Sequence, residues 1–130
     1  MTTEKHYVAY KGSKFTIEWY YTETGNSPPL DFFTSLNVEN KIKVMQLFEL
    51  LGTHGKILNI EKFRNEGDGI FAFKPKPYRF LSFFFQGGKI IVTNGFIKKQ
   101  DKLPPNEKKR AQRFEEDYKQ RVKEGKYYEQ

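Results

Sequence analysis

Arg79 is the residue of this sequence that most clearly requires a charged partner. It is the second residue of Tyr78–Phe85 (YRFLSFFF), the most hydrophobic stretch of the chain, where burying an unpaired charge is expensive. Its guanidinium therefore requires an anion. That anion is either a carboxylate, for which the neighbouring sequence offers chiefly Glu61, Glu66 and Asp68, or a phosphate brought by a ligand.

Three lysines can join Arg79. Lys74 precedes the predicted turn 75–77 (PKP) and can face Arg79 across a hairpin. Adjacent cations are tolerated where a phosphate neutralises them, as in phosphoryl transfer, but solvent exposure serves almost as well. Lys98 and Lys99 end the next predicted strand, and alternation sends their side chains to opposite faces. One of the two can therefore reach Arg79, and the alternative is an exposed polar strand end.

The distribution of charge supports an anionic partner. The net charge is +7, and residues 56–99 hold nine Lys or Arg against three Asp or Glu, whereas residues 1–55 hold five against six. A scattered surplus of lysine would serve solubility alone. Its concentration in one strand-rich segment instead indicates a binding site for a polyanion.

Composition argues against several other classes of protein. The chain has 130 residues, which fits one domain, and it has no Cys and only two His, so we expect neither a metal site nor another cofactor. It shows neither a secretory signal nor an 18-residue apolar span, so we expect a cytoplasmic protein without a membrane partner.

The first half of the chain predicts one strand and two helices. Residues 15–21 (FTIEWYY) have the composition of a strand. Ser27 is a suitable N-cap for a short helix that begins at Pro28 and ends near Asn37. Apolar residues then recur every three or four positions over 38–51, which predicts a second helix, with Gly52 and Gly55 as left-handed stops. We expect the two helices to pack antiparallel.

In the second half of the chain, the helical spacing of apolar residues gives way to segments typical of strands. Residues 69–74, 78–85 and 89–96 are typical of strands, and the turns between them predict an antiparallel meander. A helix with a narrow apolar stripe is predicted from about 106 to 124. Residues 1–14 are interpreted as an N-terminal extension, 15–124 as the domain, and 125–130 as a frayed tail.

The order of these segments resembles the RelE/ParE toxin superfamily, in particular its phage-derived HigB-like branch. The resemblance covers about residues 15–123 and rests on an ordered set of stretches: TGNSPPLDFFTSL, HGKIL, IEKFRNEGDGIFAFK, YRFLSFF, GGKIIVTNGFIKKQDKLP and the A-x-x-R-F-x-x-D-Y helix of 111–118. It implies an α+β fold in which a first strand and a two-helix hairpin pack on a twisted, mainly antiparallel four-stranded sheet, followed by a C-terminal helix.

The resemblance also implies a function. Such toxins of type II toxin–antitoxin systems bind the ribosome and cleave mRNA without a metal, through attack of the RNA 2′-hydroxyl on the neighbouring phosphate. A helix-turn-helix antitoxin neutralises them. Two other functions are compatible with the same fold: inhibition of DNA gyrase, as in ParE relatives, and a non-toxic prophage protein that binds RNA or an antitoxin.

The family motifs assign roles to residues of this chain. Arg79 and one of Lys98 and Lys99 would stabilise the charge that develops on the phosphate, and Lys74 would bind the same or an adjacent phosphate. Flanking RNA would be held by basic side chains and, through stacking on a base, by one aromatic ring: Lys62, Arg64, Lys76 and Tyr78.

The sequence departs from the family where proton transfer is concerned. Two lysines of the best-known RelE proteins fall here on Ile70 and Ala72, and a late tyrosine falls near Pro104 and Pro105. We therefore expect the general base to be a lysine beside Arg79, because a neighbouring cation lowers the pKa of an ammonium group.

Overall fold

The structure is a computed structural model that describes residues 5–100 and 102–128. In this part of the chain, three helices and a six-stranded mixed sheet form an α+β fold. In chain order the elements are β1 (Val8–Lys11), β2 (Thr16–Trp19), α1 (Pro28–Thr34), α2 (Val38–His54), β3 (Phe63–Asn65), β4 (Phe71–Phe73), β5 (Tyr78–Phe85), β6 (Lys89–Ile97) and α3 (Pro105–Lys123).

The strands lie in the order β1-β2-β6-β5-β4-β3. The predicted meander of β4, β5 and β6 is confirmed as antiparallel, whereas β2 joins β6 in parallel, with Trp19 opposite Val92. Parallel neighbours need a long crossover connection. Here the crossover from β2 to β6 contains all the elements from α1 to β5.

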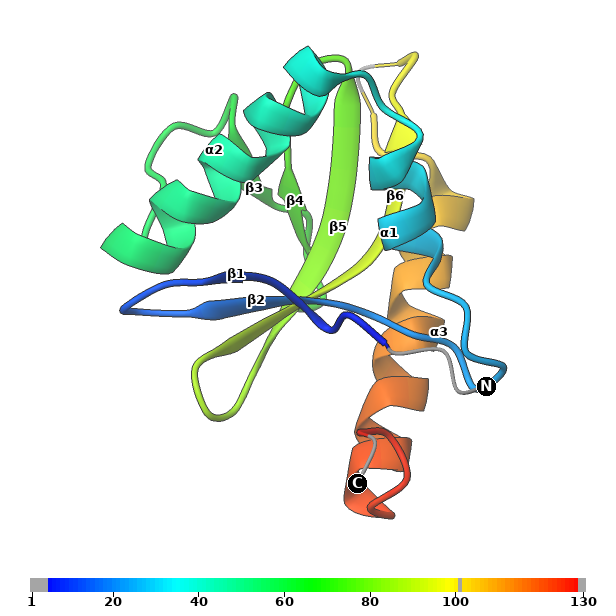
Figure 1. The fold of residues 1–130 in the computed structure, drawn as a ribbon. Coiled ribbons are helices and arrows are strands. Elements are labelled where there is room, and N and C mark those ends of the chain that lie inside the picture. The colour runs from blue at the N-terminus through cyan, green and yellow to red at the C-terminus, as the bar shows by residue number, and fades with distance from the viewer. Residues whose placement is uncertain (1–4, 101, 129–130) are drawn as a thin grey trace.

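Helices cover both faces of the sheet (Figure 1). On one face Phe48 of α2 contacts the rings of Trp19, Phe73 and Phe80. On the other face Tyr118 of α3 packs edge-on against rings of β5. The central strands are therefore buried from both sides, which explains the nearly continuous apolar sequence of β5. None of the helices in the described part of the chain has the length and apolar character needed to cross a membrane.

The prediction of four strands is wrong, because two more strands lie at the edges of the sheet. β1 pairs with β2 and β3 pairs with β4, and both added strands have at most four residues with no fully buried side chain. Such strands are held mainly by their backbone pairing, so they lack the alternating apolar pattern by which a half-buried strand is recognised. The sheet therefore begins within the predicted N-terminal extension.

The two helices form where the sequence predicts them, but they do not form an antiparallel hairpin. Ser27 caps α1 by accepting a hydrogen bond from the Leu30 amide, and Gly55 ends α2 with φ of 82°. Figure 1 shows α1 and α2 diverging from their short link, with α1 against β6 and α2 against the β1–β2 pair. Each helix thus packs mainly on the sheet.

Gly52 lies inside α2 and is not a stop. Its carbonyl oxygen accepts hydrogen bonds from the amides of Lys14 and Phe15 at 2.8 and 2.9 Å. A Cβ on Gly52 would come within 2.8 Å of the Tyr10 ring, and one on Gly12 within 2.2 Å of the Gly52 backbone. Glycine at both positions thus lets the β1–β2 turn approach the helix closely.

Residues 126–128 differ from the expected frayed tail. Tyr127 is buried, and its hydroxyl accepts a hydrogen bond from the Tyr21 amide. The Tyr128 hydroxyl donates to the buried Glu18 carboxylate at 2.7 Å. The two rings thus close the core between α3 and the start of the sheet.

The packing of Phe48 predicts a large effect of truncation on stability. Its side chain is fully buried among three other aromatic rings, so Phe48→Ala leaves a cavity and should lower the free energy of unfolding by roughly 3–5 kcal/mol. Chemical denaturation followed by circular dichroism measures this. Val38→Ala on the same helix, at a side chain 70% exposed, is the control and should change stability by less than about 0.5 kcal/mol. Equal effects of the two substitutions would contradict this account of the core.

Candidate active site at the β4–β5 turn

The turn between β4 and β5 brings Lys74 and Arg79 together. Phe73 pairs with Phe80 in the antiparallel ladder, so the next residues outward, Lys74 and Arg79, face each other across the turn. Because side chains alternate, both point to the face opposite Phe73 and Phe80. The charge of Arg79 lowers the pKa of Lys74, which agrees with this proximity of the two cations.

Lys98 is the lysine that joins Arg79 on this face. Arg79 pairs with Phe96, and the Lys98 amide donates to the Pro77 carbonyl, so alternation places the Lys98 side chain on the Arg79 face. Its positive charge contributes to the lowered pKa of Lys74, which places it within electrostatic reach of that ammonium. Lys99 also lies nearby, because it lines the same surface cavity as Arg79 and Lys98.

These side chains surround a shallow hollow of about 300 Å³ at the end of the sheet. We call it the Arg79 hollow, and it is lined by Lys76, Pro77, Arg79, Lys98, Lys99 and Gln100. Every charged side chain in this lining is positive, so the hollow is suited to an anion.

Arg79 is buried without a carboxylate in contact. It is 8% exposed, and its Nη1 donates to the Tyr78 carbonyl at 2.8 Å. Across residues 5–100 and 102–128, no carboxylate lies within 4 Å of it. Burial lowers the pKa of Arg79, and the charges of Glu66 and Glu61 oppose that effect from a distance. Among the described residues, Arg79 therefore forms no intramolecular ion pair, which was the alternative interpretation of this residue.

Lys74 is the second buried cation of the site. Its side chain is 9% exposed, and Nζ donates to the Ile60 carbonyl at 2.9 Å. Burial lowers the pKa of Lys74, and the positive charges of Arg79 and Lys98 lower it further. A lysine in this setting holds a larger fraction of neutral amine at a given pH than an exposed one, and a neutral amine can accept a proton.

The other predicted binding residues surround the turn. Arg64 in β3 adds to the electrostatic lowering of the Lys74 pKa, and Lys76 forms an exposed ion pair with Glu61 at 3.3 Å. The Tyr78 hydroxyl accepts a hydrogen bond from Asn40 Nδ2 at 3.2 Å, and its ring packs edge-on against a ring of α1. Tyr78 thus fixes the start of β5 against the helices.

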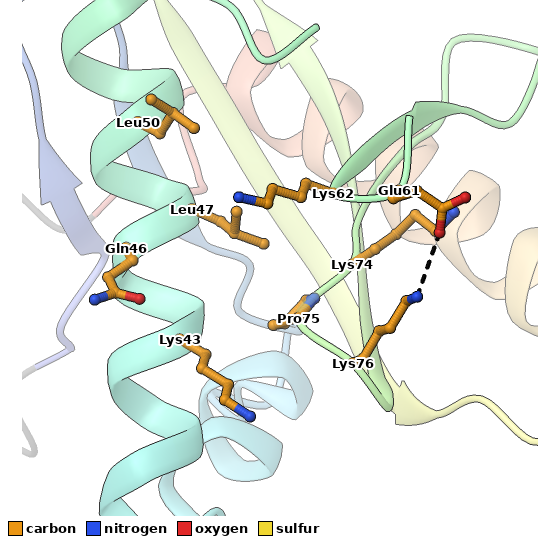
Figure 2. Close-up of a pocket in the computed structure, with 9 residues that line it drawn as sticks. All are labelled: Lys43, Gln46, Leu47, Leu50, Glu61, Lys62, Lys74, Pro75 and Lys76. Carbon is orange, nitrogen blue, oxygen red and sulfur yellow. Dashed lines mark ion pairs between the residues drawn. The ribbon is translucent and has the colours of Figure 1, made fainter. Parts of the chain in front are cut away.

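A second cavity lies on the other side of the turn, between α2 and the segment that leads into β3 (Figure 2). We call it the α2 cleft, and its volume is about 440 Å³. Lys62 lines it, as does Lys43, which sequence reasoning did not select. Lys43 stands three or four residues from Asn40 and Leu47, so the helical period could have indicated a side chain on the turn-facing side of α2.

The fold and this site define an α+β protein with a cluster of cations, two of them buried, at one end of a mixed sheet. In the described residues, no group of three or more His, Cys, Asp or Glu side chains is placed to hold a metal ion. Residues 31–115 match the family described as phage derived protein Gp49-like (DUF891), and the chain belongs to that family. At a coarse level, membership is consistent with the toxin of a toxin–antitoxin system. No curated protein matches the chain.

The electrostatics of the cluster predict a measurable shift at Lys74. Replacing Arg79 with Gln removes a neighbouring positive charge, so the pKa of Lys74 should rise towards that of an exposed lysine. An NMR titration of the Lys74 side-chain Cε resonance measures the shift. Arg113→Gln, at an exposed arginine of α3, is the matched control and should leave that pKa unchanged. A Lys74 pKa that is the same in both variants would contradict the electrostatic coupling.

Proposed function

We propose that this protein is a toxin of the RelE/HigB type that cleaves mRNA as a metal-independent endoribonuclease. One observation carries the proposal: Arg79 is buried beside Lys74 and Lys98, with no carboxylate of the described residues in contact. Three cations so placed repel one another, and an anionic group that binds among them offsets the repulsion. An RNA phosphate has the required charge, and Arg recognises phosphate through two parallel hydrogen bonds.

The proposed chemistry assigns two roles to the three cations. The neutral amine of Lys74 removes the proton of the RNA 2′-hydroxyl, whose oxygen then forms a bond to the adjacent phosphorus. Arg79 and Lys98 stabilise the additional negative charge of the pentavalent phosphate. The bond from phosphorus to the 5′-oxygen then breaks, and that oxygen takes a proton from water. The products are a 2′,3′-cyclic phosphate and a 5′-hydroxyl.

The proposed partners follow from the same activity. We propose that cleavage takes place on ribosome-bound mRNA and that a helix-turn-helix antitoxin blocks it. The basic side chains around the turn, among them Arg64 and Lys99, support binding to RNA because phosphate contacts supply most of the sequence-independent affinity. Cleavage by 2′-hydroxyl attack limits the substrate to RNA.

Loss of the Arg79 guanidinium should abolish most of the activity. Arg79→Gln removes a charge that stabilises the transition state, and we expect cleavage to fall by about 10²–10³-fold. Primer extension on cellular mRNA after induction measures cleavage, and a metal chelator in the purified reaction should have no effect.

Arg113→Gln is the control and should cleave like the unsubstituted protein. Growth arrest with intact mRNA and inhibited supercoiling by DNA gyrase would contradict the proposal.

The role of Lys74 predicts a pH dependence. Only the neutral amine accepts a proton, so the cleavage rate should rise with pH and level off above the lowered pKa of Lys74. Lys74→Met should cleave slowly and without this rise, whereas Lys109→Met, at an exposed lysine of α3, should keep the full profile. A Lys74→Met protein with an unchanged pH profile would exclude Lys74 as the base.

A further inference from the structure

The α2 cleft has an apolar floor and a cationic rim. Leu47 of α2 and Pro75 of the β4–β5 turn are buried in its lining, and Leu50 is half-buried beside them. Figure 2 shows Lys62 reaching towards α2 and Lys43 reaching from α2 towards the turn. A planar apolar group that carries a negative charge is the chemistry that fits both surfaces.

Two of the rim cations are available to a ligand. Neither Lys43 nor Lys62 has a carboxylate within 4 Å in the described part of the chain. The single carboxylate of the lining, Glu61, is already paired with Lys76. Both members of that pair are more than 60% exposed, so water screens their attraction and a phosphate can compete for Lys76.

The cleft lies next to the Arg79 hollow, and the two share one lining residue. Lys76 lines both cavities, and Lys74 lines the cleft while its pKa responds to Arg79 and Lys98. A chain with a phosphate at Arg79 can therefore cross the turn and place its next phosphate at the rim of the cleft. A positively charged groove that follows a nucleic acid backbone beside apolar surface is typical of single-strand binding.

The volume of the cleft, about 440 Å³, lies in the range of small-molecule sites. An unpaired base can enter such a space, whereas bases in a duplex are stacked and paired. The favoured occupant is therefore one nucleotide of a single strand.

We propose that the α2 cleft is a subsite for a nucleotide next to the scissile phosphate of single-stranded RNA. Lys43 and Lys62 bind its phosphate, and the base packs on Leu47 and Pro75. This inference rests on the proposed function, because it takes the Arg79 hollow as the place of the scissile phosphate. It adds a side chain of α2 to the RNA-binding surface.

The test measures RNA affinity and not cleavage. A fluorescent single-stranded RNA decamer with 2′-O-methyl groups lacks the nucleophile, so its dissociation constant can be measured by fluorescence anisotropy at several salt concentrations. Lys43→Gln and Lys62→Gln should each weaken binding by roughly three- to tenfold and reduce the slope of log affinity against log salt by about 0.7. Lys41→Gln, on the same helix but outside the cleft lining, should bind as the unsubstituted protein does.

Three results would overturn the inference. The first is equal RNA affinity for Lys43→Gln and Lys41→Gln, and the second is no binding of the decamer by the unsubstituted protein. The third is a loss of affinity for a glutamate-rich decapeptide alone, which would assign the cleft to an acidic protein partner. Thermal unfolding of each variant verifies the fold. Failure of the proposed function is distinguishable, because the unsubstituted protein would then leave cellular mRNA intact in the primer-extension assay, whatever the decamer binding shows.

Discussion

The parallel pairing of β2 with β6 is the constraint on which the rest of the fold depends. Parallel neighbours cannot be joined by a tight turn, so the chain between Trp19 and Lys89 must travel around the sheet before β6 can form. That stretch contains the two helices of one face and the strands β3, β4 and β5. With α3 on the opposite face, the centre of the sheet is closed to water, and the cationic site lies where the strands end.

The sequence indicates the elements that bury a regular apolar pattern. The periods of α2, α3, β5 and β6 are long enough to be recognised, and the turn residues before β5 and β6 predict the meander correctly. β1 and β3 are not predicted from the sequence because they are short and half exposed. They form because β2 and β4 offer a strand edge for backbone pairing. The burial of Tyr127 is not predicted for the same reason. Its ring packs against residues distant in the sequence, and the sequence around Gly125 does not indicate that contact.

The same distinction applies to the site. Lys74 and Arg79 are neighbours across one turn, so their approach follows from local sequence. Whether Lys98 or Lys99 joins them depends on which residue of β6 pairs with Arg79, and this register is fixed by packing over the whole strand, including an irregularity after Leu81. Lys43 comes from another face of the molecule, and only the docking of α2 beside the β4–β5 turn brings it near.

The hydrogen bond between Tyr128 and Glu18 has a consequence for the order of folding. Its partners are separated by 110 residues, so the buried Glu18 carboxylate is synthesised well before Tyr128. A nascent chain can build the β1–β2 pair and α2 well before residue 128 leaves the ribosome, but the carboxylate then lacks its tyrosine partner. Contacts of such long range slow folding, so completion of the native state depends on the docking of Tyr128 as well as on the assembly of the cationic site.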